Sequence, residues 1–132
     1  MLTYPEWKKQ YVDRTKQKKS DIIILPNADN VVIPEAKFTK YALDPERQPD
    51  KAKAFKLALG YDLSNYKRLI QDIKRHIKST PAVAKLKDEH GQRYEVVMKL
   101  IGPNGKQAKV LTGWIVDAKN GETRMTIVHI DD

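Results

Sequence analysis

The period of the hydrophobic pattern changes at Pro81, and this change constrains the fold most strongly. Before Pro81, apolar residues recur every three to four positions, most clearly over residues 66–77, which is typical of an amphipathic helix. After Pro81, side chains alternate as in a strand, most clearly over residues 94–101. The sequence therefore predicts an α+β fold, with N-terminal helices followed by a three- to four-stranded antiparallel sheet and the helices packed on one face.

Local signals divide the first part of the chain. They predict helices over residues 3–18, from Pro34 through Tyr41, from an N-cap at Asp50 to Gly60, and from a cap at Ser64 toward Pro81. Residues 20–30 are predicted to form an extended arm. We interpret residues 1–20 as a basic helical linker and residues 21–132 as a single domain.

The sheet is predicted from two turns, Gly102–Gly105 and Lys119–Gly121. They separate strands near residues 94–101, 106–116 and 122–130, with a short strand near 82–87. Loops of four and five residues would place Leu111, Gly113 and Ile115 on the face that receives the helices. The opposite, open face would then carry Glu95, Val97, Lys99, Thr112, Trp114, Arg124 and Thr126.

The charge balance points to a polyanionic or acidic partner. Lys and Arg number 25 against 17 Asp and Glu, a formal net charge of +8, and the excess is concentrated in residues 1–20 and 61–80. Such concentrated cations attract nucleic acid or acidic protein, although a solvated basic surface has the same composition. The longest aliphatic run, Ile22–Leu25, is far too short for a membrane span, so we expect no membrane partner.

The sequence lacks the catalytic and ligand-binding motifs of most enzyme classes. Cysteine is absent, and His76, His90 and His129 stand far apart without metal-ligand spacing. No glycine-rich phosphate loop and no Gly-x-Ser-x-Gly elbow occurs, which also disfavours an enzyme that uses a nucleotide cofactor. We therefore expect neither a metal nor a cofactor.

Metal-independent RNA cleavage is compatible with the residues that remain. RNA supplies its own nucleophile, the 2′-hydroxyl, so the protein must supply a base, an acid and cations for the phosphate. A lysine that acts as the base needs burial or cationic neighbours that lower its pKa. An arginine can clamp the phosphate, and a tryptophan or tyrosine can stack on an unpaired base.

Several motifs resemble one family of bacterial domains. They are Lys37–Glu46, Lys51–Phe55 with Leu59–Tyr61, Gly91–Val96, Thr112–Val116 and Glu122–Thr126. Over residues 24–130 the chain resembles the small C-terminal domains of bacterial polymorphic toxins and of prophage head-morphogenesis (minor head) proteins. Residues 1–20 resemble the linker after a phage head domain, which implies that Met1 begins a fragment of a longer protein.

This resemblance implies a place in the barnase/EndoU/colicin/RelE-like group of metal-independent ribonucleases. The substrate would be tRNA or another RNA, and the partner a cognate immunity protein. The site of action would be the cytoplasm of a bacterial cell, reached from a phage particle or a secretion system. Arg47 stands where this domain's pattern usually has a histidine.

The resemblance also implies roles for individual residues. The expected catalytic residues are Lys53 and Lys37 as base and acid, Arg124 as phosphate clamp, and Thr126 and Tyr41 as positioning groups; the expected substrate-binding residues are Trp114, Thr112, Arg47 and Lys51. Each also has a plain structural interpretation, as a core residue or a solvated surface charge. The alternative function is a non-catalytic module of a phage head or packaging protein that binds nucleic acid or protein.

Overall fold

The computed structural model describes residues 23–131, so the helix expected in residues 1–20 lies outside the described residues. Short helical turns and two longer helices precede a run of long strands, so the α+β prediction is confirmed. The elements are β1 (Ile23–Ile24), η1 (Ala28–Asn30), η2 (Phe38–Ala42), α2 (Pro49–Leu59), η3 (Leu63–Asn65), α3 (Tyr66–Ile77), β2 (Pro81–Asp88), β3 (Gly91–Ile101), β4 (Gln107–Asp117) and β5 (Thr123–Ile130).

The strands form one antiparallel sheet in the order β1-β2-β3-β4-β5. This is one strand more than expected, because Ile23 and Ile24 of the arm pair with the first two residues of β2. At the other edge, Val32 forms a parallel bridge with Arg124 of β5. The segment from Ile23 to Val32 therefore touches both edges of the sheet.

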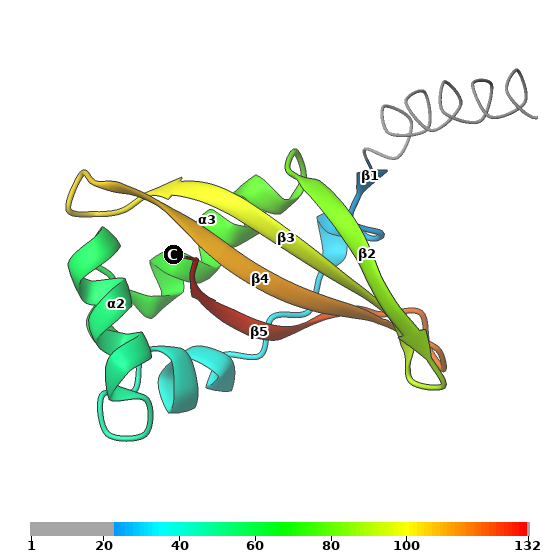
Figure 1. Ribbon diagram of the computed structural model, residues 1–132, viewed down its shortest axis with the longest axis horizontal. Coiled ribbons are helices and arrows are strands. Elements are labelled where there is room, and N and C mark those ends of the chain that lie inside the picture. Colours follow the sequence, from blue (N-terminus) through cyan, green and yellow to red (C-terminus); the bar gives the residue numbers. More distant parts are fainter. Residues whose placement is uncertain (1–22, 132) are drawn as a thin grey trace, which may run out of the picture.

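The helices cover one face of the sheet, with α3 passing behind β3 and β4 and α2 lying at one end (Figure 1). Leu69 and Ile73 of the apolar stripe of α3 are fully buried in a core that also contains Val96 and Met98 of β3. This burial is what the helical period in the sequence requires. No helix within residues 23–131 has the length and apolar character needed to cross a membrane.

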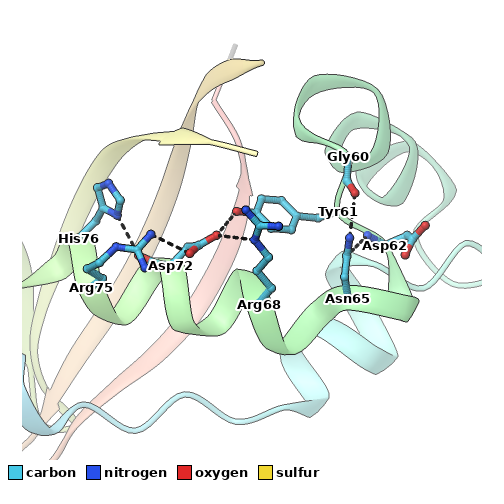
Figure 2. Close-up of polar contacts among 8 residues, drawn as sticks. All are labelled: Gly60, Tyr61, Asp62, Asn65, Arg68, Asp72, Arg75 and His76. Atoms are coloured by element: carbon cyan, nitrogen blue, oxygen red, sulfur yellow. Dashed lines mark hydrogen bonds and ion pairs between the residues drawn. The ribbon is translucent and has the colours of Figure 1, made fainter. Parts of the chain in front are cut away.

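The ends of the two helices differ slightly from the prediction. Gly60 ends α2 in the left-handed conformation with φ 85°, as expected, but α2 begins at Pro49. Asp62, rather than Ser64, caps the next segment, because its side chain accepts the Ser64 N–H at 2.9 Å. The side chain of Asn65 in turn accepts the Asp62 N–H at 2.8 Å, which completes a capping box (Figure 2).

The register predicted for β3 and β4 is wrong by one residue. The loop between them has five residues, because the Gly102 N–H donates to the Lys106 carbonyl at 2.9 Å. Thr112 therefore lies opposite Val96 on the helix side of β4, and Trp114 lies on the same side. Both are buried, at 0% and 1% exposure, so neither belongs to the open face.

A bulge changes the register again between β4 and β5. Gly113 pairs with Ile127 whereas Trp114 pairs with Met125, so Thr126 is the extra residue. Gly113 leaves space for this bulge, since a Cβ there would lie 2.5 Å from Cγ2 of Ile127 and 3.1 Å from Oγ1 of Thr126. The bulge therefore determines which way the side chains point at the edge of β5 after Met125.

Candidate functional site

A cleft of about 260 Å³ lies where η2 and the start of α2 meet the edge of β5; we call it the β5 cleft. Its lining consists of five polar and three apolar side chains: Lys37, Tyr41, Gln48, Lys51 and Thr126, with Ala42, Ile127 and Val128. Four of these five polar residues were predicted as site residues from the sequence. They come from segments up to 89 positions apart, and the fold brings them together.

Local structure holds the helical side of the cleft in place. In η2, Phe38 and Ala42 are buried and anchor the segment, so Lys37 and Tyr41 lie four residues apart along its other side. The loop that follows is fixed by Asp44, whose carboxylate accepts the Glu46 N–H at 2.9 Å. This turn reverses the chain and brings the start of α2 to the cleft.

The polar side chains of the β5 cleft have no partner in the part of the chain that the structure describes. Among residues 23–131, none of the five side chains makes a hydrogen bond or an ion pair, and no carboxylate lines the cleft. Several other cations of the described chain, by contrast, pair with Asp or Glu. The two ammonium groups of Lys37 and Lys51 and the hydroxyls of Tyr41 and Thr126 are thus free to bind an external anion.

Lys53 does not join this cleft. It follows Lys51 by two residues on α2, and two helical steps rotate a side chain by about 200°. Lys53 therefore lines a different cavity of about 540 Å³, together with Pro49, Lys56 and Leu63. The interpretation of Lys53 and Lys37 as one base–acid pair is not supported by this geometry.

The arginines expected in the site have partners of their own. The Arg124 Nη2 atom lies 2.9 Å from a carboxylate oxygen of Glu122, although Arg124 is only two residues before Thr126 on β5. The Arg47 Nε atom lies 3.8 Å from the Asp44 carboxylate, at the outside of the loop before α2. Neither lines the β5 cleft.

The aromatic platform predicted at Trp114 is not accessible. Its ring is buried, and its Nε1–H donates to Oγ1 of Thr112 at 2.8 Å. Thr112 in turn donates to the Val96 carbonyl at 2.8 Å. The two predicted substrate-binding residues therefore form a satisfied polar pair inside the core, and the cause is the one-residue difference in register.

Sequence reasoning missed Gln48, Ile127 and Val128. Gln48 immediately precedes the proline that starts α2, and no local pattern marks such a glutamine as a binding residue. Ile127 and Val128 line the cleft directly after the bulge at Thr126, where the pairing of β5 with β4 shifts by one residue. The one available signal was Gly113, since a glycine inside a strand often marks a bulge.

A second polar cluster lies outside the β5 cleft and stabilises the fold. Asp72 on α3 is buried, and its carboxylate accepts the Tyr61 hydroxyl and pairs with Arg75 at 2.8 Å and Arg68 at 3.8 Å (Figure 2). Burial, followed by the bond to Asp72, raises the pKa of Tyr61 above its ordinary value. The cluster ties the segment after α2 to α3.

The carboxylate of Asp62 has a lowered pKa. A hydrogen bond from Lys56 at 2.7 Å, followed by the bonds from Ser64, lowers the pKa of Asp62 from 3.8 to about 2. Asp62 lines the larger cavity beside Lys53, so this ion pair does not contribute to the β5 cleft. No group of three or more His, Asp or Glu side chains in residues 23–131 has the arrangement of a metal site.

Comparisons with known proteins place the chain in a family and relate its fold to a solved structure. A chain of the contact-dependent growth inhibition toxin–immunity protein complex from Klebsiella pneumoniae 342 matches with a TM-score of 0.61 and 22% identity, over 76% of this chain and 99% of that chain. This similarity shows a shared fold. No curated protein matches the sequence. The family described as "Domain of unknown function (DUF6883)" matches residues 24–131, and the chain therefore belongs to the DUF6883 family.

Proposed function

We propose that this chain is a toxin-type domain that cleaves RNA without a metal ion, with the β5 cleft as its active site. The observation that carries the proposal is the convergence of two lysines and two hydroxyl side chains, all without a partner in the described part of the chain, on a cleft lined by no carboxylate. Such a cleft favours an anion, and its size suits one phosphodiester with its neighbouring groups.

The proposed reaction uses the 2′-hydroxyl of the RNA. The 2′-hydroxyl gives its proton to water as its oxygen attacks the adjacent phosphorus; the bond to the 5′-oxygen breaks, and the 5′-oxygen takes a proton from a lysine ammonium group, which regains one from solvent. The products are a 2′,3′-cyclic phosphate and a 5′-hydroxyl. Lys37 and Lys51 would stabilise the added charge on phosphorus, and one of their ammonium groups would protonate the leaving oxygen. Thr126 would donate a hydrogen bond to a phosphate oxygen, and Tyr41 would position the bound nucleotide.

The fold comparison adds support for a toxin-related function. The matched chain belongs to a complex of a toxin and its immunity protein. A protein that blocks an RNA-binding toxin should complement its positive charge, so the partner is expected to be acidic. The present chain carries a net charge of +8, which favours the toxin side of such a pair. By the same reasoning we propose a cognate, acidic immunity protein as its partner.

Two double variants of equal charge test the active site. Lys37→Ala with Lys51→Ala removes both cleft ammonium groups, whereas Lys40→Ala with Lys53→Ala removes one neighbouring lysine from each of the same helical segments outside the cleft. Purified proteins are incubated with total RNA and with tRNA in the presence of chelator. We expect the cleft variant to lose at least about a hundredfold in cleavage rate, and the control to stay within about threefold of native.

Other outcomes would contradict the proposal. Equal losses in the two double variants would mean that overall charge, not the cleft, determines activity. Intact RNA with the native chain would exclude a ribonuclease. If the native chain then bound RNA without turnover, with affinity falling steeply between about 50 and 200 mM salt, a non-catalytic nucleic-acid-binding module would replace the proposal.

A further inference from the structure

Two side chains of the β5 cleft are better suited to a nucleobase than to a phosphate. Tyr41 has 49% of its surface exposed, and Gln48 is half-buried. Neither side chain has a hydrogen-bond partner within residues 23–131. Beside them the cleft is apolar, since Ala42, Ile127 and Val128 also line it. An exposed aromatic ring, a free amide and an aliphatic wall are therefore present in one cavity.

The backbone around Gln48 is fixed, which limits where its amide can lie. Its N–H donates to the Asp44 carbonyl at 2.9 Å, and its carbonyl accepts the Ala52 N–H at 2.9 Å. The next residue is Pro49, the first residue of α2, so the backbone is held on both sides. A side chain that starts from a fixed backbone loses less freedom when it binds a ligand.

The chemistry of these groups matches one type of base. A glutamine amide offers a donor and an acceptor side by side, and it pairs in a bidentate manner with the N6 donor and N7 acceptor of adenine. Tyrosine rings commonly stack on unpaired bases in RNA recognition. The lysines of the same cleft would hold the phosphate attached to that nucleotide.

We propose that Tyr41 and Gln48 form a base-recognition subsite that holds an unpaired adenine next to the bound phosphate. This inference rests on the proposed function, because it assigns the base specificity of the same cleft. In it, the ring of Tyr41 stacks on the base and the amide of Gln48 reads its edge. The domain would therefore cleave RNA with a preference for an adenine beside the scissile phosphate.

Binding of single nucleotides tests the subsite without any cleavage. The probes are the 3′-monophosphates of adenosine, guanosine, cytidine and uridine, together with inorganic phosphate, titrated by calorimetry. We expect native protein to bind the adenosine nucleotide about tenfold more tightly than the pyrimidine nucleotides. Gln48→Ala should abolish this preference while leaving the affinity for inorganic phosphate unchanged.

Further variants separate recognition from structure. Tyr41→Ala should weaken binding of all four nucleotides about tenfold, whereas Tyr41→Phe, which keeps the ring, should retain most of their affinity. Gln48→Glu should shift the preference toward cytosine, because a carboxylate accepts from the cytosine amino group. Unchanged melting temperatures in all variants ensure that the losses come from binding.

The outcomes are distinguishable from those of the cleavage experiment. Equal affinity for the four nucleotides, an adenine preference that survives in Gln48→Ala, or no nucleotide binding at all would overturn the subsite. An adenine preference that depends on Gln48, in a protein that leaves RNA intact, would support the subsite and overturn the nuclease. RNA cleavage without any base preference would support the nuclease and overturn the subsite.

Discussion

Replacing Gly113 by alanine tests the bulge that forms one wall of the β5 cleft. Gly113 does not have a positive φ, so an alanine can adopt its backbone conformation. The substitution is therefore expected to destabilise the fold only through the contacts of the new Cβ. The new Cβ would lie 2.5 Å from Cγ2 of Ile127, about 1–1.5 Å closer than an ordinary contact of roughly 3.5–4.0 Å. Overpacking of this kind costs about 1–3 kcal/mol.

Thermal unfolding followed by circular dichroism measures this cost. At roughly 4 °C for each kcal/mol in a domain of this size, Gly113→Ala should lower the melting temperature by about 4–12 °C. The double variant Gly113→Ala with Ile127→Ala removes the clashing Cγ2, and Ile127 is 40% exposed, so the second change should recover most of the loss. An unchanged melting temperature in Gly113→Ala, or no recovery in the double variant, would refute the bulge geometry.

Three further predictions concern stability. Thr112→Val removes the acceptor of the buried Trp114 N–H, so it should lower the free energy of unfolding in urea by about 1–3 kcal/mol. RNA cleavage per folded molecule should stay unchanged. Reduced cleavage at unchanged stability would instead mean that these residues belong to the site. Tyr61→Phe leaves Asp72 without one donor and should cost a similar amount, and a neutral result would contradict the role of this cluster. The lowered pKa of Asp62 means that its ion pair stabilises the fold above pH 3.8 and that this contribution is lost as the pH falls from 3.8 to about 2. Because this side chain is 36% exposed, the contribution is about 1 kcal/mol or less. The difference between Asp62→Asn and native should be largest at pH 5 and less than half as large at pH 2; an undiminished difference at pH 2 would contradict it.

The sequence predicted the elements well because their boundaries depend on local chemistry. Gly60 can adopt the left-handed conformation that ends α2, and Pro81 marks the change from helix to strand. The apolar stripe of α3 specifies its buried face. These signals act over a few residues, so they can be found without knowing the rest of the fold.

The register of the sheet could not be predicted in the same way. Whether Lys106 belongs to the loop or to the strand depends on the hydrogen bond that its carbonyl accepts from Gly102, and both choices fit the same sequence pattern. A shift of one residue moves every side chain to the other face, which is why Trp114 was expected on the open face and lies in the core.

The sequence predicted only part of the candidate site, because which residues line the cleft also depends on how distant segments pack together. Lys37 and Tyr41 were expected in the site only from the family resemblance, and the structure places both of them in the β5 cleft. Lys51 and Lys53 could not be told apart, since the choice depends on which side of α2 packs beside β5. Gln48 has no pattern at all and was found from the cleft itself.

Nuclear magnetic resonance gives the most direct test of the claim that one anion-binding cleft lies between η2, α2 and β5. The ¹⁵N-labelled protein is titrated with a 2′-deoxy oligonucleotide, which lacks the nucleophile and stays intact. We expect the largest amide shifts at residues 37–51 and 126–128, with small changes around Leu63 in the larger cavity and around Lys99 on the open face of the sheet. Shifts centred on either of those regions, or spread evenly over the basic surface, would contradict the account.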